Sequence, residues 1–456
     1  MIVQKFRYQV PVATQCTPSS HVQMALPAVD ALDLKSLQIL GDVSTSTSQG
    51  QFVLPRYGAQ MLIDSSSVTA GSYSIGGQQN QYQNVWNHIC NEYSAGSTDQ
   101  PKMSVYGGAQ DVPPLSATAG TAGSFDVNGV YTPPALTNYA STTWSMSSQT
   151  NPVVSGTNQL ASNGQYASGQ PFIIEVFNPT IESLEPHYFP TRLCNNMFVD
   201  IGWGPANCLI GPASASGAVT NPSYTLANLQ LQGTTYTLGN EFYQLTQQYL
   251  ASGNVIECPF KNISAWPGSF STSLDTQLNL SVQSQSVDML VACFLDGNYR
   301  TWGPVVSGLN SSKFFQLGKG TGVRQLNFMI NGQSQPAWGV TPKHAFGQTM
   351  SDLGMYTAGR GCYKNLSNYA GYLTRWFVWA MSTSMPFQEA MNRAISGLDT
   401  IGQNATLSFS CQSDPTNVAA GLEGTGAAAY SNIPLVFVVS TQTLLIGAGG
   451  SVAVNI

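Results

Sequence analysis

The sequence predicts a mainly β protein, and three observations support this class. Apolar and polar residues alternate with a period of two in many short segments, as they do in strands with one buried face. Other segments are short continuous apolar runs, which are typical of strands buried on both faces. The chain also contains 44 Gly and 25 Pro, which punctuate these segments as turn residues do.

The composition excludes two other classes of protein. Hydrophobic residues make up 42% of the 456 residues and aromatic residues 10%, whereas disordered chains lack such residues. The longest apolar stretch, 434–450, is interrupted by polar residues at 440–443 and is too short for a transmembrane helix. The first residues, MIVQKFRYQVPVATQC, contain no apolar core of a signal peptide, so we expect no secretion signal.

Charged residues are unusually scarce. The chain has 16 Lys+Arg and 22 Asp+Glu, or 8% of its residues, against roughly 25% in ordinary soluble domains. Because charge keeps protein surfaces apart, we expect copies of this chain to cover much of each other's surface. The net charge of −6 and the lack of any run of basic residues argue against direct nucleic-acid binding.

Residues 82–253 contain two predicted helices and one unusual segment. Tyr82, Val85, Trp86, Ile89 and Tyr93 lie on one face of the first helix. The second has Phe242, Leu245, Tyr249 and Leu250 on one face, with Asn240 as a possible N-cap and Gly253 as its end. We expect both helices to pack beside sheets.

Residues 103–174 form the unusual segment, which holds only two charges, Asp111 and Asp126. Long connections without regular structure are usually functional or disordered. The aromatic and proline residues Tyr131, Pro133, Pro134, Tyr139 and Trp144 favour a long insertion that packs on a neighbouring subunit. Partial disorder of the segment is the alternative.

The C-terminal half shows the strand patterns most clearly. Alternating segments lie at 278–282, 326–330, 407–411 and 452–456, and the second of these ends in a hairpin signal, Asn331-Gly332. Continuous apolar runs at 289–295 and 435–439 predict strands that are buried on both faces. A third helix is predicted over 385–395, where apolar residues recur every four positions before Gly397.

The eight cysteines are not arranged as a metal or redox motif, because none forms a C-x-x-C pair. Without a secretion signal, we expect reduced and mostly buried thiols. They are Cys16, Cys90, Cys194, Cys208, Cys258, Cys293, Cys362 and Cys411. Five N-x-S/T sequons carry no meaning in a chain that is not secreted.

No catalytic, cofactor-binding or metal-binding residue is predicted. The four histidines, His21, His88, His187 and His344, show no metal-ligand spacing. The glycine-rich LGKGTG at 317–322 departs from the P-loop because Gly320 follows Lys319, so we interpret it as a tight turn. No G-x-S-x-G motif occurs. A glycoside hydrolase with a carboxylate pair remains the enzyme alternative.

Two N-terminal segments resemble the double jelly-roll major capsid proteins of viruses. In 52–89, the order of strand, turn and helix resembles the start of the family's first barrel, on residues Pro55, Gly58, Ala59, Met61, Leu62, Ile63 and Tyr82. In 171–204, Phe189-Pro190 and the strand at 197–201 resemble the family's extended crossing and the strand after it.

The resemblance continues through the rest of the chain. Residues 225–253 resemble the last strand of the first barrel and the helix that follows. Segments 281–297, 324–336 and 398–411 resemble strands of a second barrel that starts near Asp275. The pattern is most similar to capsid proteins of the Polinton, adintovirus and adomavirus type. The insertion at 103–174 departs from it, and the two halves show no clear internal repeat.

The resemblance implies two consecutive eight-stranded jelly rolls with a few short helices. The expected organisation is an N-terminal arm at 1–28, a first jelly roll at 29–260 with an insertion at about 103–170, and a second at 261–456. The implied function is that of a non-enzymatic, hexon-like capsid protein. Homotrimers would form pseudo-hexameric capsomers of an icosahedral virion, with penton and minor capsid proteins as further partners. A trimeric β-rich fibre that binds a receptor or glycan is the alternative.

Overall fold

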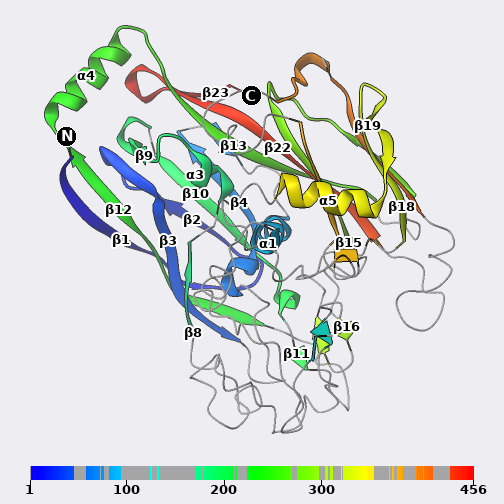
Figure 1. Cartoon of the computed structure of the whole chain (residues 1–456). Helices are drawn as coiled ribbons and strands as arrows, with labels where there is room; N and C mark the ends of the chain where they lie inside the picture. Colours follow the sequence, from blue (N-terminus) through cyan, green and yellow to red (C-terminus); the bar gives the residue numbers. More distant parts are fainter. Residues whose placement is uncertain are drawn as a thin grey trace.

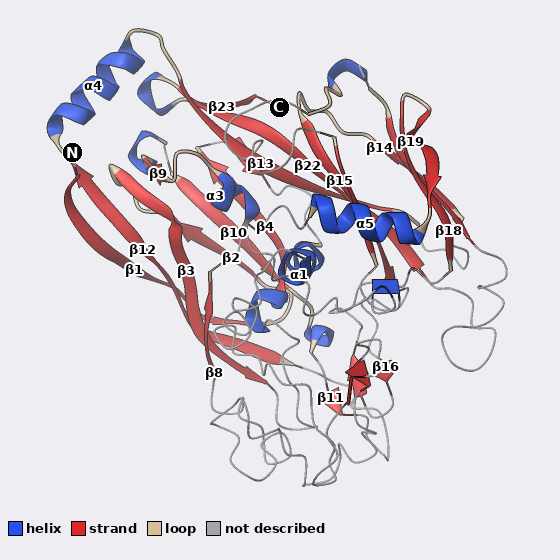
Figure 2. Cartoon of the chain, viewed as in Figure 1, coloured by secondary structure: helices blue, strands red, loops and turns tan. Residues whose placement is uncertain are grey.

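The structure is a computed structural model. It describes residues 2–45, 58–71, 73–76, 82–93, 124–125, 131–132, 170–175, 178–194, 196–209, 211–212, 223–269, 275–296, 303–306, 309–311, 320, 322–353, 369, 372–373, 377–383, 397–403, 405–413 and 432–455. Two groups of antiparallel strands lie side by side, with helices between and around them (Figure 1 and Figure 2).

The N-terminal group is a jelly roll. One sheet has the strand order β1–β12–β3–β8, with β9 also pairing with β3, and the other has the order β2–β10–β4–β5. The strands are β1 (Ile2–Cys16), β2 (His21–Ala25), β3 (Ala31–Thr45), β4 (Ile63–Ala70), β5 (Tyr73–Gly76), β8 (Gln170–Ile174), β9 (Tyr188–Phe189), β10 (Met197–Trp203) and β12 (Tyr224–Leu238). Two antiparallel sheets connected in this order make a jelly roll.

The C-terminal group repeats this architecture. Its sheets have the orders β13–β22–β15–β20, with β23 also pairing with β22, and β14–β21–β18–β19. The strands are β13 (Ile256–Pro267), β14 (Thr276–Leu280), β15 (Val287–Asp296), β18 (Val323–Ile330), β19 (Gln333–Val340), β20 (Val378–Ser382), β21 (Leu407–Ser413), β22 (Asn432–Ile446) and β23 (Val452–Asn455). Numbered within each barrel, the eight main strands occupy the same positions in both, so the predicted double jelly roll is confirmed.

The predicted buried strands are also confirmed. In β15 every residue from Val287 to Leu295 is buried, and so is 435–439 of β22. One face of these strands points into the second barrel. The other lies against the first barrel, where the rings of Trp86 and Phe437 are 5.3 Å apart. Burial on both faces explains why these strands are apolar without alternation.

Four helices are described in addition to short 3-10 turns. They are α1 (Gln83–Tyr93), α3 (Pro179–Ser183), α4 (Asn240–Ala251) and α5 (Pro342–Asp352). The predicted first and second helices are α1 and α4. Helix α5 was not predicted, because Phe346 and Met350 are its only large apolar residues. The helix predicted over 385–395 lies outside the described residues.

Two local predictions need correction. The N-cap of α4 is Gly239 rather than Asn240, which is the first helical residue. In the segment that resembles the start of the first barrel, Met61 and Leu62 belong to a buried 3-10 turn, η1 (Gly58–Leu62), and β4 begins only at Ile63. Extended backbone was predicted there because a buried turn is as apolar as a strand.

The organisation of the N-terminus and of the linker differs from the predicted ranges. Residues 1–28, predicted as an arm, contain β1 and β2, and β1 pairs with β12 along its length. The boundary predicted at 260/261 falls inside β13, and β13 also precedes the predicted start near Asp275. The segment between Leu238 and Ile256, which contains α4, connects the two pairs of sheets.

Both barrels direct the same end toward one side of the molecule. A small sheet, in the order β11–β17–β16, joins β11 (Gly211–Pro212) after the first barrel's β10 to β17 (Leu309–Ser311) and β16 (Gly303–Val306) after the second barrel's β15. In Figure 1 this sheet lies at the end of the molecule opposite α4. The two barrels therefore stand roughly parallel rather than head to tail.

The low-charge segment 103–174 is described at three places only. Two short strands, β6 (Ser124–Phe125) and β7 (Tyr131–Thr132), pair with each other, and residues 170–174 form β8. The segment connects β5 to β8 in the first jelly roll. Its predicted packing on a neighbouring subunit concerns residues outside the described ranges. No helix in the described part of the chain is long and apolar enough to span a membrane.

Candidate functional site

The residues that could have carried chemistry are dispersed in the structure. His21 lies 3.8 Å from Asp200 on β10, and His187 lies 3.2 Å from Glu185. His88 is buried on α1, and His344 contacts Thr341 at the start of α5. Across the described ranges, no group of three or more His, Cys, Asp or Glu residues could hold a metal ion.

The described cysteines behave as buried apolar residues. Seven form no disulfide, and all of them are buried except the partly buried Cys90, while Cys362 lies outside the described residues. Burial raises the pKa of Cys194 to about 12 and that of Cys258 to about 12, with a smaller contribution from Cys194 to the latter. Such thiols are protonated and unreactive at neutral pH.

The glycine-rich segment at 317–322 ends in a turn that leads into a strand. The amide of Val323 donates to the carbonyl of Gly320 at 3.1 Å, and β18 begins at once. A phosphate-binding loop requires a following helix whose N-terminus faces the phosphate. The described part of the segment therefore agrees with the predicted turn.

The most extensive functional candidate is the contact between the two barrels. Elements α1 and α3 of the first barrel lie against the sheet of β13, β22 and β15 in the second (Figure 1). The α3 segment covers the free edge of β13: Ser183 Oγ accepts from the amide of Lys261 at 2.8 Å. The amide of Glu185 donates to the carbonyl of Pro259 at 3.0 Å. An edge strand that could pair with another chain is thus blocked.

Uncharged amides hold α1 and α3 in place on the first barrel's side of this contact. Gln83 donates to Asn87 at 2.9 Å, and Asn87 donates to the carbonyl of Gln60 at 3.5 Å. Asn178, the N-cap of α3, donates to Ser66 at 3.0 Å. Burying uncharged groups with their partners avoids the desolvation penalty of ions, which helps to explain how so large a contact needs few charges.

One ion pair is buried at the same contact. Lys261 Nζ lies 2.8 Å from Asp288 Oδ2 and 2.6 Å from Thr441 Oγ1. Ser286 donates to the other oxygen of Asp288 at 2.7 Å. The side chains of Lys261 and Asp288 are 10% and 1% exposed. Such a pair stabilises only when the remaining hydrogen bonds are made, as they are here.

A carboxyl group close to α1 has no such compensation. Glu182 on α3 is partly buried, and its Oε1 atom is buried without a hydrogen-bond partner. Burial raises the pKa of Glu182 to about 8. Burial also raises the pKa of Cys90 on α1, with a smaller contribution from the Glu182 carboxyl. The carboxyl is therefore largely protonated at neutral pH.

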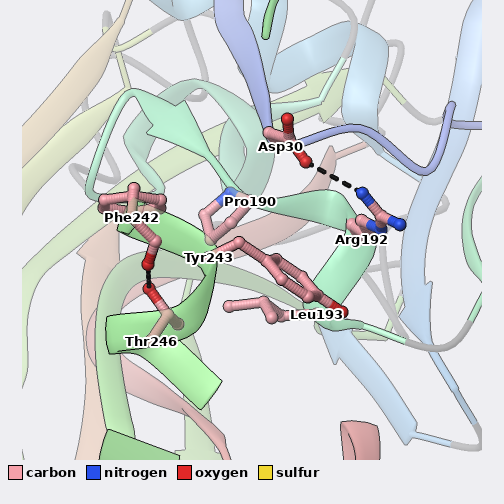
Figure 3. A pocket seen from close by; sticks show the side chains of 7 residues that line it. All are labelled: Asp30, Pro190, Arg192, Leu193, Phe242, Tyr243 and Thr246. Carbon is pink, nitrogen blue, oxygen red and sulfur yellow. Dashed lines mark hydrogen bonds and ion pairs between the residues drawn. The ribbon is translucent and has the colours of Figure 1, made fainter. Parts of the chain in front are cut away.

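Helix α4 exposes apolar residues that were predicted to pack against a sheet. Phe242, Leu245 and Tyr249 are 44%, 65% and 50% exposed, and only Leu250 is buried. A small pocket lies between the helix and the first barrel, lined by Asp30, Pro190, Arg192, Leu193, Phe242, Tyr243 and Thr246 (Figure 3). The Arg192 guanidinium lies 4.8 Å from the ring centre of Tyr243 and 3.2 Å from Asp30.

Among the described side chains of the β1–β12–β3–β8 sheet, the outer face of β12, β3 and β8 carries amides and two acidic residues. Gln232 donates to Gln38, and Gln38 donates to Glu175 at 3.0 Å. Asp42 accepts from Asn228 at 2.9 Å. Gln38, Asp42 and Glu175 are partly buried within the chain, Asn228 is exposed, and Gln232 is 4% exposed. The face is well suited to contact another protein surface because desolvating amides costs less than desolvating charges.

The fold is shared with solved structures of viral proteins. A chain of the PBCV-1 virus capsid is 10% identical, with a TM-score of 0.56 over 99% of this chain and 96% of that one. A chain of the Sputnik virophage is 12% identical, with a TM-score of 0.56 over 100% and 89% of the two chains. The Faustovirus major capsid protein is 7% identical, with a TM-score of 0.56 over 97% and 91%.

Comparisons by sequence find no relative. No protein-family model and no curated protein matches the chain. The resemblance predicted from the segments 52–89 and 171–204 is therefore confirmed at the level of the fold. The chain has the double jelly-roll fold, and it shares this fold over nearly its whole length with viral major capsid proteins.

Proposed function

We propose that this chain is a viral major capsid protein with no catalytic role. Three copies form a pseudo-hexameric capsomer of six jelly rolls, and capsomers assemble an icosahedral shell in the virion. The observation that carries the proposal is the repeated strand order of two parallel barrels in one chain, together with structural similarity to capsid proteins over nearly all of its length.

The surface chemistry supports the same function. Two barrels in one chain present similar outlines, so three chains can approximate sixfold packing. Heterologous contacts that close give rings, and rings that tile give shells. With charge restricted to 8% of residues, broad faces can be covered without burying many ions.

The predicted domain ranges and partners belong to this proposal. We place the first jelly roll at about 29–260, together with β1 and β2, and the second at about 261–456, together with the start of β13. Penton and minor capsid proteins are the further partners that a closed shell requires. Folded chains bind no specific nucleic-acid sequence, because the net charge of −6 gives the genome no basic surface.

The native mass of the purified full chain tests this function. The proposal predicts a trimer of about 146 kDa, three times 48.6 kDa, or whole shells in light scattering and analytical ultracentrifugation. A stable globular monomer at micromolar concentration contradicts it. Elongated rods favour instead the trimeric fibre that the composition also allows.

A further inference from the structure

Helix α4 and the residues after it carry most of the exposed large apolar side chains in the described part of the chain. Eight such side chains are exposed there, and five of them lie within residues 242–255. They are Phe242, Tyr243, Leu245, Tyr249 and Val255. Figure 1 shows α4 at one end of the molecule, beyond the strands of the first barrel. Because soluble monomers rarely gather exposed apolar residues in one place, α4 is a candidate contact surface.

One side of α4 fixes the helix to the rest of the chain. Tyr243 and Thr246 line the pocket against the first barrel that Figure 3 shows, and Leu250 is buried. The guanidinium of Arg192, which is paired with Asp30, lies over the ring of Tyr243. These contacts on one side hold the helix at a single rotation about its own axis.

A second apolar stripe on α4 is open. Phe242, Leu245 and Tyr249 each directly precede one of the three anchoring residues, so their stripe is rotated by about 100° from the anchored side. Their spacing of three and then four residues is that of the a and d positions in a coiled coil, a narrow stripe that suits contact with another helix. The remaining face is polar and includes the exposed Gln244 and Gln247.

The open stripe is too small to hold an unrelated protein by itself. The exposed parts of Phe242, Leu245 and Tyr249, at 44%, 65% and 50%, amount to about 300 Å² if each whole side chain offers about 200 Å². A stable interface buries about 800 Å² on each partner. Copies of this chain that already meet through their barrels need no such area, because the stripe then adds to contacts that exist. The size of the stripe therefore favours a second copy as its partner.

The charge of α4 also favours contact between identical copies. A symmetry axis brings the same residue of each copy together, so charged residues beside the axis repel one another. Among its twelve residues, α4 has a single charged one, Glu241 in the first turn. The stripe itself and the glutamine-rich face are uncharged. Repulsion between identical α4 helices is therefore limited to one carboxylate per copy.

We propose that the α4 helices of three copies pack together through Phe242, Leu245 and Tyr249. Each stripe contacts the stripes of both neighbours around the threefold axis, at the end of the capsomer opposite the β11–β17–β16 sheet. The inference rests on the proposed function, because it requires three copies in one capsomer. It adds a helical contact to those between barrels, and it explains why the stripe is open in the single chain.

Cysteine crosslinking of the assembled full chain tests this contact. In L245C, a short bismaleimide should join two copies covalently, because the stripes of neighbouring copies face each other. Q247C places a thiol on the polar face of the same helix and is the matched control, which should give no covalent dimer above the wild-type level. The wild type measures the background from the native cysteines, of which the described ones are mostly buried. Denaturing gel electrophoresis reads the covalent dimers.

The dissociation of trimers gives a second readout. L245Q should raise the protein concentration at which trimers dissociate by about tenfold, because it removes an apolar side chain from the contact in all three copies. Q247A should leave this concentration unchanged. Analytical ultracentrifugation measures both. The dissociated L245Q chain should be as stable as the dissociated wild type in circular dichroism, because Leu245 is 65% exposed within the single chain.

The outcomes separate this inference from the proposed function. If wild-type trimers form but L245C and Q247C crosslink alike, the α4 contact is wrong while the capsomer remains. Trimers of L245Q that dissociate as the wild type does contradict it as well. If L245Q instead abolishes binding of the trimer to phosphatidylcholine vesicles, the stripe contacts a bilayer and the assignment to a second copy is wrong. A wild-type chain that stays monomeric contradicts the proposed function, and the inference falls with it.

Discussion

At the scale of single residues, the contact between the barrels contains the carboxyl of Glu182, whose neutral form is more stable than its ionised form in the folded chain. Folding raises the pKa of Glu182 from 4.5 to about 8, so the folded chain binds a proton that the unfolded chain releases in this range. The stability that this proton supplies is complete below about pH 4.5 and is lost as the pH rises through about 8.

The variant E182Q should therefore remove a pH dependence. Its free energy of unfolding at pH 8 should exceed that of the wild type by about 1–3 kcal/mol, because between pH 4.5 and 8 the wild type loses stability through its carboxyl whereas Gln does not titrate. The difference should shrink toward pH 5. Urea unfolding at several pH values measures it, with E241Q on the exposed face of α4 as the control. A constant difference across the range would contradict the assigned burial.

Removing one member of the buried ion pair should destabilise the chain, whereas removing the charge of Glu182 should stabilise it. K261M leaves Asp288 in the interior with only Thr441 and Ser286, and should cost about 3–5 kcal/mol. Replacing both charges in K261M/D288N should recover part of this loss, since no uncompensated charge remains. Denaturant unfolding of the two variants measures both free energies of unfolding. Equal destabilisation by K261M and by K261M/D288N would mean that the two charges are not coupled.

At the scale of elements, α4 shows what a pattern of apolar residues can and cannot predict. The spacing of Phe242, Leu245, Tyr249 and Leu250 predicts the helix, which the structure confirms. It does not tell whether the apolar face packs within the chain or remains open. Only Leu250 is buried, because α4 bridges the two barrels and touches the body along a narrow line.

Leu245 and Leu250 form a matched pair for testing this placement. L250A should destabilise the chain by about 2–4 kcal/mol, because it leaves a cavity beneath the helix. L245A should change the free energy of unfolding by less than about 0.5 kcal/mol, because the side chain is 65% exposed. Thermal unfolding of the two variants measures both effects. Equal destabilisation would show that α4 packs through both positions.

Strands were more predictable than their boundaries. The alternation at 326–330 and the Asn331-Gly332 turn gave the β18–β19 hairpin, because both turn residues adopt positive φ angles of 53° and 75°. In contrast, β1 was missed as a strand of the sheet. Its sequence mixes Lys5, Arg7 and Pro11 into the pattern, as edge strands do, and such residues also suit an extended arm.

At the scale of the whole molecule, the same barrel architecture occurs twice in one chain, and the candidate site is the contact between the two barrels. The sequence shows no internal repeat, because strand order, not residue identity, is what the two barrels share. Helix α5 could not be predicted from the sequence, because its buried side consists of small residues such as Ala345 and Thr349.

The scarcity of charge also becomes interpretable at this scale. Within the first barrel, the amides of Gln83, Asn87 and Asn178, rather than ions, fix the elements α1 and α3 that meet the second barrel. The outer β1–β12–β3–β8 sheet carries a similar pair, the buried Gln232 and the partly buried Gln38. A surface with the chemistry of an internal contact is expected to become an internal contact when copies assemble.

The most direct test of the central claim is a cryo-electron microscopy projection of the purified assembly along its symmetry axis. The account predicts a ring of six barrels with threefold symmetry and a hexagonal outline. A particle with two barrels, or an elongated fibre with its barrels stacked along an axis, would contradict it.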